Sequence, residues 1–97
     1  MMNMKIRFYV TSSGRSPIEE FLLTCSQDLR NHFFDAVSLL ENGVRLELPV
    51  SRPLFNVCHG LHELRLKDRA GQVRIFYFIK RGEAIYMLHA FRKKSQT

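Results

Sequence analysis

The second half of the chain contains three stretches in which apolar and polar residues alternate with a period of two. They cover Leu61–Lys67, Gln72–Ile79 and Ala84–Phe91, and short turns at 68–71 and 81–82 separate them. This period is typical of half-buried strands, and turns this short join antiparallel neighbours. The sequence therefore predicts an antiparallel meander of three strands.

The first half predicts one strand followed by two helices. Apolar residues alternate with polar ones over 4–10, which indicates a strand. Ser16 and Pro17 suit the N-cap and first residue of a helix expected over 17–24. A second helix is expected from Gln27 to a stop at Gly43. Its apolar face would consist of Leu29, Phe33, Ala36, Val37 and Leu40.

These elements make a single α+β domain of 97 residues in the order β-α-α-β-β-β. The helix hairpin must cover one face of the antiparallel sheet, because no other segment can do so. Residues 44–60 include Pro49 and Pro53 and show no regular pattern. A loop this long has a function or contains a short strand.

All of the net charge of +6 lies in the last part of the chain. Residues 61–97 carry nine Lys and Arg against three acidic residues, whereas residues 1–60 carry six of each. The cations alternate with strand-forming apolar residues, so a rigid sheet should hold them. We expect a surface that binds a polyanion. A charged face that serves solubility alone is the alternative.

Neither the cysteines nor the hydropathy indicates export. Cys25 and Cys58 have no paired spacing, and a strand pattern, not an apolar leader, follows the first residues. Apolar runs are far shorter than the roughly 20 residues that span a bilayer. We expect a cytoplasmic protein without membrane contact, in which both thiols are reduced and act as small apolar fillers.

One cluster, Cys58-His59-x-x-His62, contains residue types that ligate zinc. No second ligand pair stands at a matching spacing, and the carboxylates are few and scattered. We therefore expect neither a metal site nor another cofactor.

Alternation also indicates which side chains share a face of the sheet. On the last strand, one side should present Ile85, Met87, His89, Phe91 and Lys93. With a suitable register, the three meander strands would present one candidate catalytic group, namely Glu63, Arg65, Arg74, His89 and Lys93. The register itself does not follow from the sequence.

Three motifs on these strands point to a family. They are Leu61-His62-Glu63-Leu64-Arg65, Val73-Arg74-Ile75-Phe76-Tyr77, and Leu88-His89-Ala90-Phe91-Arg92-Lys93-Lys94-Ser95-Gln96. With the order of the elements, they resemble the RelE superfamily of toxins from type II toxin-antitoxin systems, in its phage-derived HigB-like branch. The resemblance implies a ribosome-dependent mRNA endonuclease that uses no metal and is neutralised by a helix-turn-helix antitoxin. It also implies a further helix after the last motif, beyond Thr97.

The same resemblance implies roles for individual residues. Arg65 and Arg74 fall where such toxins place cations on the scissile phosphate, and His89, Lys93 and Lys94 fall in the closing-strand motif. The chemistry supports the first assignment, because a guanidinium stays charged and binds a phosphate with two parallel hydrogen bonds. A surface ion pair of Arg65 with a nearby acid is the alternative.

Metal-free RNA cleavage also needs a base for the ribose 2′-hydroxyl and an acid for the leaving 5′-oxygen. We prefer His89 for proton transfer, and Glu63 or a lysine such as Lys93 remains open. A histidine packed in a strand beside Met87 and Phe91 is the other interpretation of His89.

Further candidates would bind RNA around the reacting groups, namely Lys67, Tyr77, Phe91, Arg92 and Lys94. Tyr77 could stack on a base or belong to the core. The main hypothesis is an endoribonuclease that acts on mRNA at the ribosome. The rival is a catalytically inactive phage-derived module that binds nucleic acid or the antitoxin.

Overall fold

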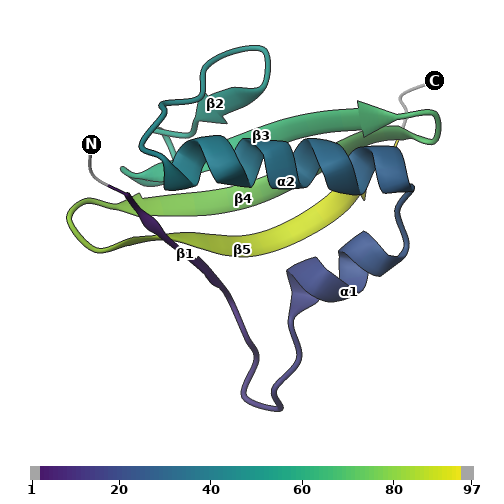
Figure 1. The fold of residues 1–97 in the computed structure, drawn as a ribbon, viewed down its shortest axis with the longest axis horizontal. Helices are drawn as coiled ribbons and strands as arrows, with labels where there is room; N and C mark the ends of the chain where they lie inside the picture. Colours follow the sequence, from purple (N-terminus) through teal and green to yellow (C-terminus); the bar gives the residue numbers. More distant parts are fainter. Residues whose placement is uncertain (1–2, 95–97) are drawn as a thin grey trace.

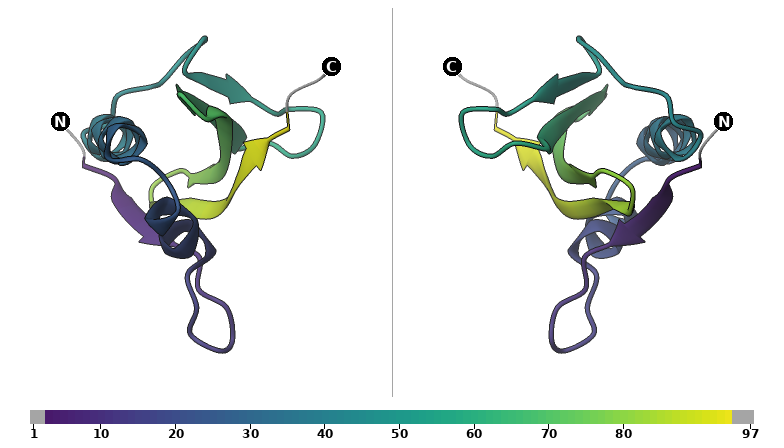
Figure 2. Two further views of the ribbon diagram at one scale, coloured as in Figure 1. Left: turned by 90° about the vertical axis from the view of Figure 1, so that its right-hand side faces the viewer. Right: turned by 90° about the vertical axis from the view of Figure 1, so that its left-hand side faces the viewer.

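A computed structural model describes residues 3–94 of the chain. Its elements are β1 (Lys5–Phe8), α1 (Pro17–Leu23), α2 (Gln27–Glu41), β2 (Ser51–Pro53), β3 (Leu61–Asp68), β4 (Gly71–Lys80) and β5 (Ala84–Lys93) (Figure 1). The strands form one five-stranded sheet in the order β1-β5-β4-β3-β2, and both helices lie on the same face of it (Figure 2). The predicted α+β class is confirmed, as are the two helices and the antiparallel meander of β3, β4 and β5.

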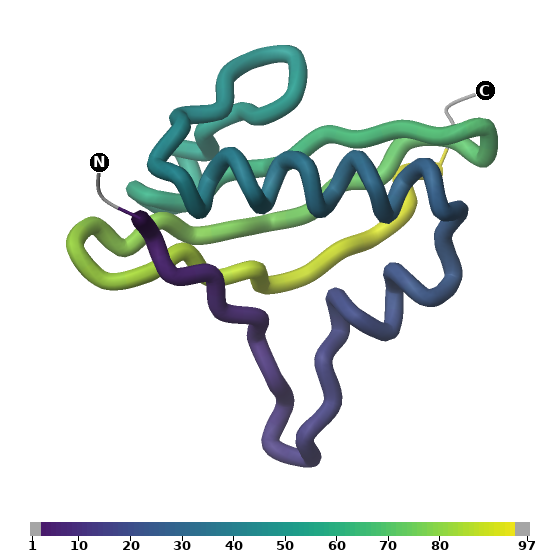
Figure 3. Tube along the Cα trace, viewed as in Figure 1, coloured from purple at the N-terminus to yellow at the C-terminus, as the bar shows by residue number. Residues whose placement is uncertain are grey.

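β1 is shorter than predicted and is the one described strand that runs parallel to its neighbour. It lies at the edge of the sheet parallel to β5, with Lys5 opposite Ala84, an arrangement that requires the chain to cross over through other elements. β1 ends at Phe8, and residues 9–16 then run away from the sheet before α1 begins (Figure 3). Tyr9 and Val10 were expected in the strand but are largely exposed.

Residues 44–60 contain a short strand, which was one of the two interpretations of this region. β2 pairs antiparallel with β3, with Ser51 opposite Leu64. β2 forms the second edge of the sheet. Pro53 has no N–H to donate, and an edge strand tolerates this because it has no further strand to pair with on its outer side. The buried Ser51 hydroxyl is hydrogen-bonded to the Tyr77 hydroxyl, which ties β2 to the core.

The predicted start of α1 at Ser16 and the predicted end of α2 at Gly43 are both confirmed. The Ser16 hydroxyl accepts a hydrogen bond from the Glu19 amide at the start of α1, and Ser26 caps α2 in the same way through Leu29. Gly43 follows α2 with a φ of 84°, the left-handed conformation that ends a helix. Within residues 3–94, no helix is long and apolar enough to cross a membrane.

The hydrophobic core fills the space between the helices and the sheet. The largest buried side chains in it are Ile18, Leu22, Leu29, Phe33, Leu40, Leu64, Ile75, Tyr77, Ile85 and Met87. Both helices pack on this face of the sheet. In the described part of the chain, the opposite face of the meander therefore carries no helix (Figure 2).

A β-bulge decides which residues of β5 enter the core. The register between β4 and β5 shifts between Phe76 and Tyr77, so that Phe76 lies opposite His89 and Tyr77 lies opposite Met87. The extra residue in β5 reverses the alternation. Met87 is therefore buried and His89 is exposed on the other face. The prediction that Ile85 and Met87 share a face with His89 is wrong for this reason.

Candidate functional site

The face of the sheet opposite the helices, called the open face below, brings together most of the residues singled out from the sequence. The side chains on it include Glu63, Arg65, Lys67, Arg74, Phe76, His89, Phe91 and Lys93. Residues directly opposite in a ladder lie on the same face, and here Arg65 lies opposite Arg74, which lies opposite Phe91. All five candidate catalytic residues thus occupy one face of three adjacent strands. Their roles stay predictions.

A pair of arginines with one shared carboxylate lies at the middle of the open face. The Glu63 Oε1 atom is 3.2 Å from Arg65 Nε and 4.0 Å from Arg74 Nε. Arg74 also donates a hydrogen bond of 2.6 Å from Nη2 to Gln72 Oε1. Arg65 therefore forms an ion pair with Glu63, which was one of the two roles predicted for it. One carboxylate against two guanidiniums leaves a net positive charge that a phosphate could neutralise.

These charged side chains are held by the sheet and are not free in solvent. The Arg65 side chain is 29 % exposed and that of Arg74 is 10 % exposed. Electrostatic interactions are stronger in such a partly buried setting than at a fully exposed surface. The geometry can therefore bind an anion approaching from the open side, with Arg65 the more accessible of the two cations.

An aromatic strip borders the arginine pair on the side of β5. The ring centroids of Phe76 and Phe91 are 5.6 Å apart, and His89 stacks on Phe91 at 6.3 Å with 23° between the planes. His89 is exposed and the two phenylalanines are half-buried. Aromatic rings at such a surface can stack on unpaired bases. Phe76 is missing from the candidates predicted from the sequence, although alternation along β4 places it on the same face as Arg74. His89 packs beside Phe91, as one interpretation had it, but not beside Met87.

Tyr77 lies on the helix side of β4 and not on the open face. Its side chain is 1 % exposed, its hydroxyl bonds to Ser51, and its ring stacks on His62 at 5.1 Å. Burial raises the pKa of the Tyr77 hydroxyl, and the bond from Ser51 opposes this shift. Of its two predicted roles, the structure agrees with the core tyrosine, because a buried ring cannot stack on RNA.

Arg92 also points to the helix side, where it forms a bidentate pair with Asp68 at 2.9 and 3.2 Å. Asp68 accepts two further hydrogen bonds, from the Ser26 hydroxyl and the Ala70 amide. Because these donors favour the charged carboxylate, with Arg92 the largest contributor, they lower the pKa of Asp68. Arg92 thus joins β5 to the β3–β4 turn and to the start of α2, and it is not available on the open face.

The remaining basic candidates surround the arginine pair. Lys67 and Lys93 both lie opposite Gln72, one on each side of β4, and both are exposed. Lys94 follows β5 and is exposed as well. The last two residues of the closing motif, Ser95 and Gln96, lie outside the described part of the chain.

Cys58, His59 and His62 do not form a metal centre. Among residues 3–94, no three His, Cys, Asp or Glu side chains come together to hold an ion. Cys25 is buried in the core as predicted. Cys58 is exposed, so the prediction that it fills apolar space is wrong. It lies in the 54–60 loop outside the helix–sheet core.

The fold and the open face define a class of small α+β proteins with a curved sheet that carries cations and aromatic rings on its uncovered side. Residues 20–97 match the model of a family described as phage-derived protein Gp49-like (DUF891). The chain belongs to this Gp49-like family, which is related to the HigB and RelE toxins. No curated protein matches the chain.

Proposed function

We propose that this protein is the toxin of a toxin-antitoxin system and cleaves mRNA on the ribosome without a metal ion. Membership of the Gp49-like family supports this proposal. The observation that carries it is the arginine pair, Arg65 opposite Arg74 in the β3–β4 ladder, with the candidate proton-transfer groups on the same face.

Arg65 and Arg74 would bind the scissile phosphate and stabilise the pentavalent phosphorane. Negative charge increases on the phosphate oxygens as the ribose 2′-oxygen attacks, so fixed cations stabilise the transition state more than the ground state. The side chain of Arg74 is held by Gln72 and Glu63. A cation fixed in this way needs little reorganisation when the charge develops.

We assign proton transfer to His89. Its imidazole is exposed on the open face and has no hydrogen-bond partner among the described residues, so it is free to meet a ribose hydroxyl. Glu63 already contacts both arginines, which suits a counter-ion better than a base. Lys93 lies two positions further along the same side of β5 and would add positive charge near the substrate.

Inducible expression followed by primer extension on a translated message tests the proposal. The native protein should stop growth and produce new RNA ends, whereas Arg65→Ala and Arg74→Ala should stay folded and lose both effects. Arg69→Ala is a matched control, because Arg69 is exposed in the β3–β4 turn and outside the ladder. RNA binding that weakens with salt but yields no new ends would instead support a binding module without chemistry.

The predicted partner follows from the same face. A helix-turn-helix antitoxin that neutralises the protein would cover the basic sheet or act on the helices, and acidic or apolar segments suit those surfaces. Co-expression with a neighbouring helix-turn-helix gene should restore growth. Elemental analysis of the purified protein tests the metal-free mechanism, and stoichiometric zinc would contradict it.

A further inference from the structure

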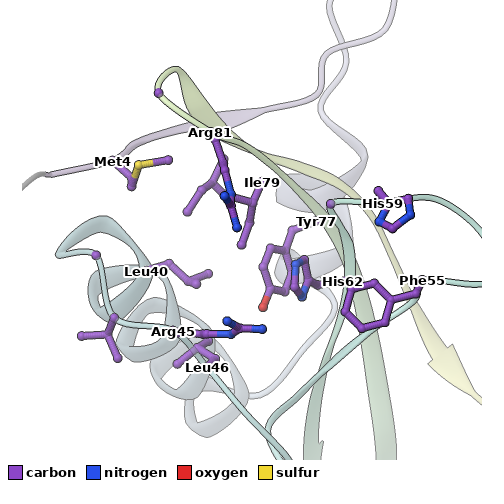
Figure 4. A pocket seen from close by; sticks show the side chains of 15 residues that line it. Met4, Leu40, Arg45, Leu46, Phe55, His59, His62, Tyr77, Ile79 and Arg81 are labelled. Atoms are coloured by element: carbon purple, nitrogen blue, oxygen red, sulfur yellow. The ribbon is translucent and has the colours of Figure 1, made fainter.

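A pocket of about 680 Å³ opens on the helix side of the sheet, at the end where β4 turns into β5 (Figure 4). Its floor consists of Leu40 from α2, Ile79 from β4 and Ile85 from β5, together with Met4 just before β1 and Leu46 from the loop after α2. Tyr77 and Ile79 alternate with the open-face residues of β4, so this pocket lies on the other side of the sheet from the candidate RNA-binding site. The volume is within the range of small-molecule binding sites.

Two cations reach this apolar pocket from different segments. Figure 4 shows Arg81, from the β4–β5 turn, and Arg45, from the loop after α2, on opposite sides of the hollow. No acidic residue of the described chain lines the pocket. Within residues 3–94, neither guanidinium has a carboxylate within 4.0 Å, although four other arginines of this chain do. The positive charge of the pocket is therefore not balanced from within the described protein.

The polar wall of the pocket is formed by His62 stacked on Tyr77. Burial, and secondly the charge of Arg45, lowers the pKa of His62. A neutral imidazole at this wall can donate one hydrogen bond without adding another positive charge. Since the Tyr77 hydroxyl is bonded to Ser51, the other polar side chains that line the pocket are those of His59, His62 and the two arginines.

We infer that this pocket binds a small amphipathic carboxylate, with the carboxylate between Arg45 and Arg81 and the apolar part on the floor formed by Leu40, Ile79 and Ile85. The apolar floor disfavours a nucleotide or an inorganic phosphate, which would leave polar oxygens against hydrocarbon. Arg45 and Arg81 disfavour an uncharged apolar ligand, which would leave both cations without a counter-ion. This inference is independent of the proposed cleavage, because it concerns the other face of the sheet.

Octanoate is the probe that tests the inference, and octanol, which has the same chain without the charge, is its control. In a titration of ¹⁵N-labelled protein followed by NMR, octanoate should shift the amides of residues 44–46, 62 and 79–82 in a saturable manner. Octanol should bind about tenfold more weakly or not at all, because it lacks the charge-assisted hydrogen bonds. Equal binding of both compounds would overturn the carboxylate assignment, and no saturable shift in these residues would overturn the site.

Arg45→Gln and Arg81→Gln should each weaken octanoate binding about tenfold. Both side chains are exposed, so the variants should fold, and the dispersion of their NMR spectra checks this. Arg52→Gln is the matched control, since Arg52 is an exposed arginine that does not line the pocket. If Arg52→Gln weakened binding as much as the other two, the effect would be one of net charge and the site would be wrong.

Discussion

Arg65 of β3 lies directly across the antiparallel ladder from Arg74 of β4. Like charges at opposed positions of a sheet destabilise it, and Glu63 is the one acid within 4.0 Å of either guanidinium among the described residues. The pair is therefore a cost to the fold that an anionic ligand would reduce. Variants of these residues should therefore change the stability of the fold and the binding of RNA by different amounts.

Replacing Glu63 by Gln should affect stability and RNA binding in opposite directions. The two arginines would lose their counter-ion, so the free energy of unfolding should fall by about 1 kcal/mol. Affinity for single-stranded RNA should rise, because a negative charge is removed beside the two arginines proposed to bind phosphate. Thermal unfolding and fluorescence anisotropy with labelled RNA measure the two effects.

The matched control is Asp35→Asn, an exposed acid in the middle of α2 that should change neither quantity. Weaker RNA binding by the Glu63→Gln variant would mean that the carboxylate aligns the arginines and does not compete with RNA.

His89→Gln should lower the cleavage rate by about two orders of magnitude and leave the melting temperature unchanged. Glutamine keeps the size and a hydrogen bond but cannot titrate, and His89 is exposed, so little packing is lost. Ribosome-dependent cleavage and thermal unfolding of one preparation give both numbers. A lower melting temperature with a native rate per folded molecule would move proton transfer to Glu63 or Lys93.

Arg92→Gln should reduce stability but change RNA affinity little. Its partner Asp68 has a side chain that is only 7 % exposed and would lose its bidentate donor. We expect a loss of about 1 kcal/mol, because Arg92 itself is partly exposed to solvent. Urea unfolding and RNA anisotropy of Arg92→Gln and Arg65→Gln, measured side by side, check this contrast. If both variants lost RNA affinity equally, Arg92 would contact RNA as the sequence predicted.

Stability should also fall as the pH falls below neutrality, owing to His62. Its pKa is lowered in the folded protein, so the unfolded chain takes up the proton first, near the usual value of about 6.5. The contribution of His62 is thus complete above that pH and is lost as the pH falls toward the folded-state value. The urea midpoint at pH 7.5, 6.5 and 5.5 measures it.

His62→Gln should flatten this dependence, whereas His32→Gln, at an exposed position on α2, should leave it as in the native protein. An unchanged slope in the His62 variant would contradict the assignment.

The helices and the meander could be predicted because their signals are local. Ser16 acts through a hydroxyl bond to an amide three residues away, Pro17 and Gly43 act through their own backbone, and the alternation in β3 is decided by neighbouring residues. The direction of β1 could not be predicted, because its partner β5 is remote in the sequence. Such pairings depend on the whole fold and not on a local pattern.

The candidate site was predictable on β3 and only partly on β4 and β5. Phe76, Tyr77 and Phe78 are all aromatic, so alternation gives no contrast that would place Tyr77 in the core. In β5, one extra residue at the bulge separates Met87 from His89. A period-two pattern cannot reveal such an insertion when both faces carry large side chains.

The parallel pairing of β1 with β5 brings Lys5 next to Ala84. Closing so long a loop is slow, because the entropy is lost before the contact is gained. During synthesis, β5, which contains His89 and Lys93, is the last strand to be made. The β3–β4 hairpin can therefore form, and the helices can pack on it, before β5 pairs with β4. A chain interrupted before β5 has left the ribosome would carry Arg65 and Arg74 but lack His89, so under the proposed mechanism a truncated translation product would bind phosphate without cleaving RNA.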